Sequence, residues 1–177
     1  MSEPSNGVMV RLGTTADSDG IATVQVHGWR TAYRGIVPDA VLDRMSVADR
    51  AVRWADVLGE PRESKPIWVA ASESAEVIGF ASAGPGRDDD LPPTTGELWA
   101  IYVDPRWAGR GVGRRLLGEA TEWLTAANYA HAVLWVLAEN ARARRFYERA
   151  GWRHDGLAKA LPFDDVAVDE VRYARAL

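Results

Sequence analysis

The chain of 177 residues contains no cysteine and only three histidines. Without cysteine there is no disulfide bond, no thiolate nucleophile and no zinc or iron–sulfur site built on cysteine ligands. The histidines, His27, His131 and His154, are dispersed and lack the His-x-x-x-His spacing that places two metal ligands on one helix face. The sequence therefore predicts no metal site.

Signals for a membrane or for export are also lacking. Residues 1–7 are small and polar and predict a flexible leader, with no basic segment followed by an apolar run. No stretch approaches the roughly 18 consecutive apolar residues of a transmembrane helix. We therefore expect a cytoplasmic protein without a membrane partner.

Charge has no strong bias of either sign. Lysine and arginine number 21 against 25 aspartates and glutamates, which gives a net charge of −4 at pH 7. This balance offers no bulk attraction for nucleic acid, so no nucleic-acid partner is expected and any anion site must be local. Apolar residues make up 47% and charged residues 26%, as in ordinary globular proteins. The length and the lack of an internal linker or repeat predict one domain over residues 8–177.

Hydrophobic periodicity predicts an alternation of helices and strands. Val47, Ala51, Trp54 and Leu58 recur at steps of four, three and four, as one helix face requires. The predicted strands are residues 8–12, 67–71, 77–81, 98–103, 132–137, 152–159 and 168–174, and the predicted helices are residues 14–33, a stretch from 38, 47–58, 112–124 and 140–150. This order predicts the α/β class, with one mixed sheet flanked by helices.

A glycine-rich turn separates the predicted strand 98–103 from the helix that begins near Val112. It reads Ala108-Gly109-Arg110-Gly111-Val112-Gly113-Arg114. A helix N-terminus offers unpaired N–H groups and a partial positive charge, and glycines allow a phosphate to approach them closely, which suits a pyrophosphate. The alternative is a tight strand–helix turn that requires glycine for its geometry alone.

Two common phosphate-binding motifs do not fit this turn. A P-loop requires Lys-Ser or Lys-Thr after its last glycine, where this chain has Arg114 and Arg115. A dinucleotide-binding fold requires Gly-x-Gly-x-x-Gly in its first βα unit, whereas this turn lies past the middle of the chain with Gly-x-Gly-x-Gly spacing.

Two motifs, in order, resemble those of the GCN5-related N-acetyltransferase (GNAT) family. The first is a strand that ends in Val103-Asp104-Pro105, followed by the glycine turn. The second, Asn-x-x-Ala-x-x-Phe-Tyr-x-x-x-Gly-Phe, matches residues 140–152, with Trp152 in the last aromatic place. The segment 28–38 also resembles one branch of the family. Ala108 departs from the usual Gln or Arg; Arg106 offers an alternative frame, which the strand and helix spacing disfavours.

The resemblance implies a single-domain acyl-CoA N-acyltransferase fold with a mostly antiparallel mixed sheet, and a site for acetyl-CoA as the acetyl donor. Backbone groups of the central strand would pair with the pantetheine arm, the glycine turn would hold the pyrophosphate, and Asn140 would bind from the opposite side of the cleft. The implied cofactor-binding residues are Ile101, Tyr102, Val103, Gly109, Arg110, Gly111, Val112, Gly113, Arg114 and Asn140. Arg144 or Arg145 would reach the nucleotide phosphates, unless both are simply solvated.

The resemblance also implies catalytic roles for two residues. Tyr147 would protonate the departing thiolate, since a phenol with an ordinary pKa near 10 carries its proton at pH 7; the alternative is a packing role beside Phe146. Glu97 would act as the general base, directly or through water; the alternative is a surface charge at a strand end. The backbone N–H of Val103 would polarise the thioester carbonyl.

The acceptor is expected to be a primary amine of a small molecule that attacks acetyl-CoA directly in a ternary complex. Trp29 and Tyr33 are the expected substrate contacts, with core packing as their alternative. The other residues in the acceptor region are Arg34, Phe163, Asp164 and Asp165, and His27 is a further contact or a solvated helix residue. Residues 88–90 are expected to be a solvated loop. The alternative function is a non-catalytic acetyl-CoA sensor, and relatives suggest a homodimer.

Overall fold

The structure, a computed structural model, describes residues 7–163 and 166–177, with the backbone alone for Phe163. Residues 1–6 of the predicted leader, and Asp164 and Asp165 of the expected acceptor region, lie outside the described residues. The elements are β1 (Met9–Leu12), the 3₁₀ turn η1 (Thr15–Asp17), α1 (Ser18–Ala32), α2 (Asp39–Asp43), α3 (Val47–Gly59), β2 (Ile67–Ala71), β3 (Val77–Pro85), β4 (Thr95–Val103), the 3₁₀ turn η2 (Pro105–Trp107), α4 (Val112–Ala126), β5 (His131–Leu137), α5 (Ala141–Arg149), β6 (Arg153–Phe163) and β7 (Val166–Ala176).

Seven strands form one sheet in the order β1-β2-β3-β4-β5-β7-β6. Every neighbouring pair is antiparallel except β4 and β5, which run parallel. The predicted α/β class and the mostly antiparallel mixed sheet are therefore confirmed.

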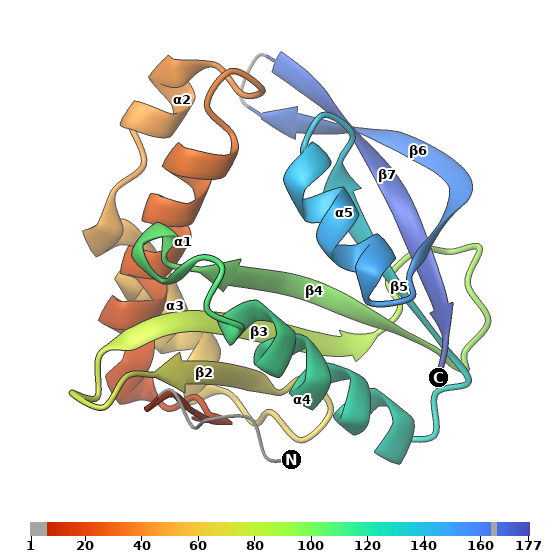
Figure 1. Cartoon of the computed structure of the whole chain (residues 1–177), viewed down its shortest axis with the longest axis horizontal. Coiled ribbons are helices and arrows are strands. Elements are labelled where there is room, and N and C mark those ends of the chain that lie inside the picture. The colour runs from red at the N-terminus through yellow and green to blue at the C-terminus, as the bar shows by residue number, and fades with distance from the viewer. Residues whose placement is uncertain (1–6, 164–165) are drawn as a thin grey trace.

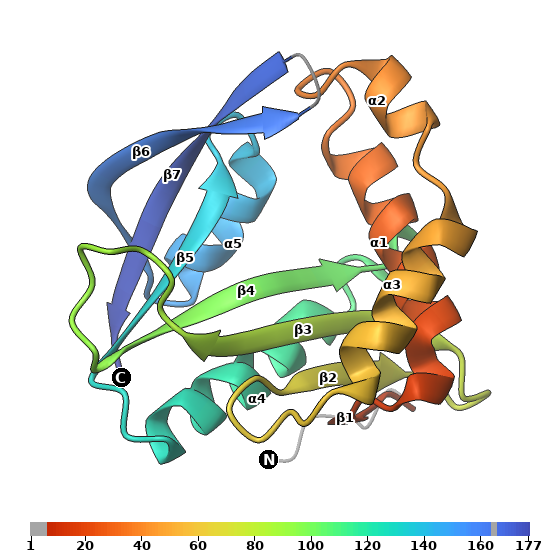
Figure 2. The same cartoon turned by 180° about the vertical axis from the view of Figure 1, so that it is seen from behind.

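Helices cover both faces of the sheet. The helices α4 and α5 lie on the face seen in Figure 1, and α1 and α3 lie on the face seen in Figure 2. On the α4 side, Leu116 and Leu124 are fully buried with Ile78, and on the α1 side Ile21 is buried with Phe80. Each buried aliphatic or aromatic side chain contributes about 1.5–3 kcal/mol through the removal of apolar surface from water.

Local signals in the sequence explain where the helices begin. Ser46 accepts a hydrogen bond from the N–H of Asp49 at 3.2 Å and so caps α3. Asn140 caps α5 in the same way, with its Oδ1 3.1 Å from the nitrogen of Ala143. The N-cap of α4 is Gly111, whose φ of +80° is a left-handed conformation that glycine adopts without strain.

The strands β4 and β5 stay together for only part of their length. They pair from Thr95 to Leu98, opposite His131 to Leu134, and then diverge, as Figure 1 shows. The β3–β4 register shifts so that Ala100 pairs with Ser82 while Leu98 pairs with Ala83. Trp99 is thus an extra residue, a β-bulge that bends β4 near the point of divergence.

Candidate active site

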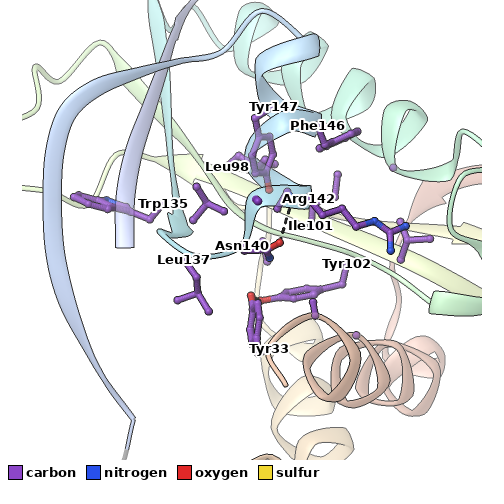
Figure 3. Close-up of a pocket in the computed structure, with 18 of the residues that line it drawn as sticks. Tyr33, Leu98, Ile101, Tyr102, Trp135, Leu137, Asn140, Arg142, Phe146 and Tyr147 are labelled. Carbon is purple, nitrogen blue, oxygen red and sulfur yellow. Dashed lines mark hydrogen bonds between the residues drawn. The ribbon is translucent and has the colours of Figure 1, made fainter. Parts of the chain in front are cut away.

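A cavity of about 1220 Å³ lies where β4 and β5 separate. Its walls come from α1, β4, the turn before α4, β5, α5 and the β6–β7 hairpin. It brings together most of the predicted site residues, all except Trp29 and Arg110. Those that line it are Tyr33, Glu97, Ile101, Tyr102, Val103, Gly109, Gly111, Val112, Gly113, Arg114, Asn140 and Tyr147. Figure 3 shows Tyr147 and Asn140 on one side of this cavity, and Tyr33 and Tyr102 on another.

The turn before α4 exposes backbone N–H groups toward the cavity. Gly109 and Gly111 both have φ near +80°, and a side chain built on either would meet no atom within 4 Å. The N–H groups of Gly109, Gly111, Val112 and Gly113 have no acceptor within the described residues. Open space in front of several unpaired N–H groups at a helix N-terminus suits an anion such as a pyrophosphate.

The arginines around this turn have different surroundings. Arg114 lines the cavity. The guanidinium of Arg110 lies 5.0 Å from the ring centroid of Trp107. Arg110 borders a second depression and does not line the main cavity. Arg106 pairs with Asp104 at 2.9 Å and Glu76 at 2.7 Å. It is therefore occupied elsewhere, which supports the frame that places Ala108 at the start of the motif.

Beyond the divergence, β4 has β3 on one edge and no strand on the other within the residues described. The N–H of Asp104 donates to the carbonyl of Ile78 at 2.9 Å. Because alternate residues of a strand direct their N–H groups to the same side, Ile101 and Val103 direct theirs away from β3. This free edge is where a strand-like ligand can add to the sheet, as expected for residues 101–103.

The helix α5 contributes Asn140 and Arg142 to the cavity (Figure 3). Because the Oδ1 of Asn140 is used in capping, its side-chain NH₂ is the group that can donate to a ligand. Arg144 bonds instead to the carbonyl of Ala138 at 2.9 Å and to the hydroxyl of Tyr173 at 3.1 Å, so it holds the fold together. Neither Arg144 nor Arg145 lines the cavity, whereas Arg142 does.

Tyr147 is 7% exposed, and its ring and its hydroxyl have different surroundings. Its ring packs 5.2 Å from that of Phe146 and 6.4 Å from that of Trp152. Its hydroxyl points into the cavity, as Figure 3 shows, and no hydrogen bond to it occurs within the described chain. Burial raises the pKa of Tyr147 well above its ordinary value, so the phenol keeps its proton at neutral pH.

Glu97 lines the cavity and is 1% exposed, so it is no surface charge. Its carboxylate is held by Arg87, with Oε2 3.0 Å from the backbone nitrogen and Oε1 3.1 Å from Nε. Arg87 also lies 5.2 Å from the ring centroid of Trp99. These donors favour the ionised form of the carboxylate and so make it a weaker base.

Aromatic side chains form another part of the wall. The hydroxyls of Tyr33 and Tyr102 lie 3.2 Å apart, and burial raises the pKa of both phenols. Trp29 does not line the cavity: its ring packs 5.2 Å from that of Tyr33 and 6.4 Å from that of Tyr102, with Arg50 5.4 Å from its own centroid. Of the two expected substrate contacts, Tyr33 thus faces the cavity and Trp29 supports it from behind.

The expectation of a solvated loop at residues 88–90 is wrong for Asp88. This carboxylate is 18% exposed and accepts hydrogen bonds from Trp135 at 2.8 Å, Lys159 at 3.2 Å and Arg172 at 3.3 Å. Burial by itself would raise the pKa of Asp88, but these three donors together lower it below its ordinary value. The loop after β3 is thereby tied to the β6–β7 hairpin, which the sequence pattern did not indicate because the partners are distant in the chain.

We expect Arg172→Leu to lower the free energy of unfolding at pH 7 by about 2 kcal/mol, because Arg172 is 7% exposed and pairs with Asp88, Asp90 and Asp155. The folded-state pKa of Asp88 and Asp90 is lowered, so their pairing adds stability above an unfolded pKa near 4 and loses it as the pH falls through the folded pKa. Urea unfolding should show the deficit shrinking between pH 7 and pH 3. The exposed Arg153→Leu should show little deficit, and an equal deficit in both variants would contradict the prediction.

His27 is an exposed residue of α1. The Nδ1 of His27 lies 3.8 Å from the Oδ2 of Asp104, and the residue does not border the cavity. Within residues 7–163 and 166–177, no group of three histidine, aspartate or glutamate side chains could hold a metal ion. Over the same residues, no helix is long and apolar enough to span a bilayer.

Comparison with known proteins decides the family. Residues 29–152, more than half of the chain, match the acetyltransferase (GNAT) family. The chain belongs to the GNAT family. The GNAT resemblance seen in the two motifs is therefore confirmed, and the protein is an acyltransferase.

Individual GNAT proteins agree with this assignment. The uncharacterized N-acetyltransferase YuaI of Bacillus subtilis is 34% identical over 133 residues, which are 75% of this chain and 73% of that protein. The PaiA N-acetyltransferase of Thermoplasma acidophilum, solved in complex with coenzyme A, has a TM-score of 0.69 at 18% identity, with 100% of both chains covered. The ribosomal-protein-alanine N-acetyltransferase of Brucella melitensis has a TM-score of 0.73 at 21% identity over 96% of this chain and 99% of that one. The latter two show the fold.

Several cavity residues of this GNAT protein were not predicted from the sequence. They are Arg87, Trp135, Arg142, Lys159, Leu161 and Glu170. Those on β5, β6 and β7 carry no motif. The spacing of Lys159 and Leu161, two residues apart on β6, was the available signal for a shared face.

Proposed function

We propose that the protein transfers the acetyl group of acetyl-CoA to a primary amine of a small molecule while both substrates are bound. The observation that carries this proposal is that a single cavity contains the N–H-rich turn, the free edge of β4 and an aromatic wall, with the Tyr147 hydroxyl facing the same space. The first two features fit a long anionic thioester, and the aromatic wall fits a separate, smaller acceptor.

A small acceptor is favoured because apolar packing closes one side of the cavity. Val37 and Leu42, from the α1–α2 region, form a buried cluster with Leu137 of β5 and Val168 of β7. This cluster connects the two halves of the molecule, which approach each other beyond the divergence of β4 and β5 in both views (Figures 1 and 2). An extended polypeptide acceptor requires an open groove, whereas a closed end suits a small molecule.

Acetyl-CoA, when bound, supplies the acetyl group as a thioester. The N–H groups of Ile101 and Val103 would bind its arm as an added strand, and an N–H on this edge would polarise the thioester carbonyl. The amine nitrogen forms the new bond to the carbonyl carbon as the carbon–sulfur bond breaks. Tyr147 gives its proton to the departing sulfur and regains one from the amine nitrogen, which loses a proton as the amide forms.

A thiol-release assay tests this function. Free CoA is followed from acetyl-CoA in the presence of amines, amino acids, polyamines, aminoglycosides and peptides with free N-termini, and calorimetry measures acetyl-CoA binding in parallel. We expect tight binding and release with one class of small amine. Acetyl-CoA binding without CoA release for any acceptor tested would favour the acetyl-CoA sensor. The absence of acetyl-CoA binding would overturn the proposal.

Two further expectations from the family, a homodimer and a cytoplasmic location, stay predictions. Sedimentation velocity tests the first, and cell fractionation tests the second.

A further inference from the structure

The carboxylate of Glu170, on β7, lines the cavity. In the sheet register Glu170 lies opposite Leu137 of β5 on one side and opposite Lys159 of β6 on the other. Cross-strand neighbours share a face of the sheet, and all three residues line the cavity. Glu170 therefore belongs to the wall that the C-terminal hairpin contributes.

Glu170 differs from Asp88 and Glu97, the other half-buried or buried carboxylates of the cavity wall, because it has no bonded partner; Glu139, the remaining cavity carboxylate, is exposed to solvent. The cation directly opposite it, Lys159, is drawn away: its Nζ lies 3.2 Å from Asp88 and 3.8 Å from the ring centroid of Trp135. Glu97 is held by Arg87. In the part of the chain that the structure describes, Glu170 has neither a hydrogen bond nor an ion pair.

The surroundings of Glu170 are partly apolar and partly charged. The residue is half-buried, and burial raises the pKa of its carboxyl group above the ordinary value. Lys159 and Arg87 act in the opposite direction, and the charges of Glu97 and Asp88 add to the effect of burial. The tyrosine pair lies close by, since the negative charge of Glu170 contributes to the raised pKa of Tyr33 and of Tyr102.

We propose that Glu170 binds the acceptor amine as its ammonium ion and takes its proton, so that the acceptor is a cationic amine with an apolar body and no carboxylate. This proposal rests on the proposed acetyl transfer and adds its acceptor-side base. An unpartnered anion beside apolar walls favours an ammonium group. The two cations whose charges act on Glu170, Arg87 and Lys159, already have anionic partners, so neither is available beside it for a substrate carboxylate.

The proton balance of the step is complete. The ammonium R–NH₃⁺ gives one proton to the Glu170 carboxylate, which later releases it to solvent. The neutral amine then forms the nitrogen–carbon bond, the carbon–sulfur bond breaks, and the sulfur receives the Tyr147 proton. The second amine proton, lost as the amide forms, restores Tyr147. The products are the amide, CoA thiol and one proton in solution.

Glu170→Gln is the direct test, with phenethylamine as the probe. We expect kcat/KM at pH 7 to fall about 10²-fold, with calorimetric acetyl-CoA affinity unchanged. The loss should shrink toward pH 10, where a substantial fraction of the amine is already neutral in solution, because a missing base matters less there. Glu170→Asp should recover part of the activity. Asp169→Asn, at the exposed neighbouring position on the opposite face of β7, should behave as wild type.

The acceptor class is tested by a matched pair, phenethylamine and phenylalanine, which differ by one carboxylate. We expect phenethylamine to be acetylated at least tenfold more efficiently. If the wild type acetylates amines and Glu170→Gln matches it at every pH, or if phenylalanine is preferred, the Glu170 proposal is wrong while the acetyl transfer stands. If Glu97→Gln alone reproduces the pH-dependent loss, Glu97 is the base. If the wild type acetylates no amine, both proposals fail.

Discussion

We expect the Tyr147→Phe variant to lose about 10²-fold in kcat and to bind acetyl-CoA as tightly as the wild type. The substitution removes the hydroxyl that faces the cavity and keeps the ring that packs against Phe146 and Trp152. Without this proton donor, the sulfur must leave as an unprotonated thiolate. Initial rates of thiol release give kcat, and calorimetry gives the affinity.

Tyr173→Phe is the matched control because it removes the same atom from a tyrosine outside the cavity. The hydroxyl of Tyr173 donates to Glu148 at 2.7 Å and accepts from Arg144 at 3.1 Å. Loss of this hydroxyl should lower the free energy of unfolding by about 1 kcal/mol and leave kcat unchanged. Equal kcat values for Tyr147→Phe and the wild type would remove Tyr147 from the mechanism.

The pH profile gives a second check on Tyr147. Burial raises its pKa, and an acid with a raised pKa stays protonated to higher pH. We therefore expect this group to cause no loss of wild-type activity on the alkaline side up to about pH 10. An activity that falls with an apparent pKa near 8 would contradict a buried tyrosine as the proton donor.

The sequence predicted those parts of the fold and site that depend on residues near one another in the chain. Each strand and helix follows from local periodicity, and Ser46 and Asn140 mark helix starts through caps that bond three residues onward. The turn around Gly111 is recognisable because its chemistry, N–H groups at a helix start, is contained in a few consecutive residues. Tyr147 was found because it lies within a motif.

The other parts of the site depend on residues brought together from distant strands. For Glu97 the sequence left a general base and a surface charge as alternatives, and its burial became evident only with Arg87 placed across the hairpin from it. The sequence around Asp88 predicts a solvated loop, because its partners Lys159 and Arg172 come from the distant strands β6 and β7. The strand β7 has alternating residues, but alternation does not say which face lines a cavity, so Glu170 could not be identified before the sheet register was known.

The cofactor site depends on the turn at Gly111, and we expect Gly111→Glu to lower acetyl-CoA affinity more than 100-fold. The φ of Gly111 is +80°, and a side chain there extends into the open space that the free N–H groups face. A glutamate would bring negative charge to the place where the phosphates must bind, and the left-handed backbone would cost about 1–2 kcal/mol for any residue with a Cβ. Calorimetric titration with acetyl-CoA measures the loss.

Two alanine variants separate strain from charge in this result. Gly111→Ala brings the backbone cost without the carboxylate, so its affinity should lie between those of the wild type and Gly111→Glu. Gly118→Ala lies within α4, where an added Cβ meets nothing within 4 Å and φ is not positive, so affinity should stay unchanged. Stability there should rise by up to about 1 kcal/mol, since alanine favours helix over glycine. If Gly111→Glu binds acetyl-CoA as tightly as Gly118→Ala does, the phosphates bind elsewhere, because an anion cannot share that space without an energetic cost.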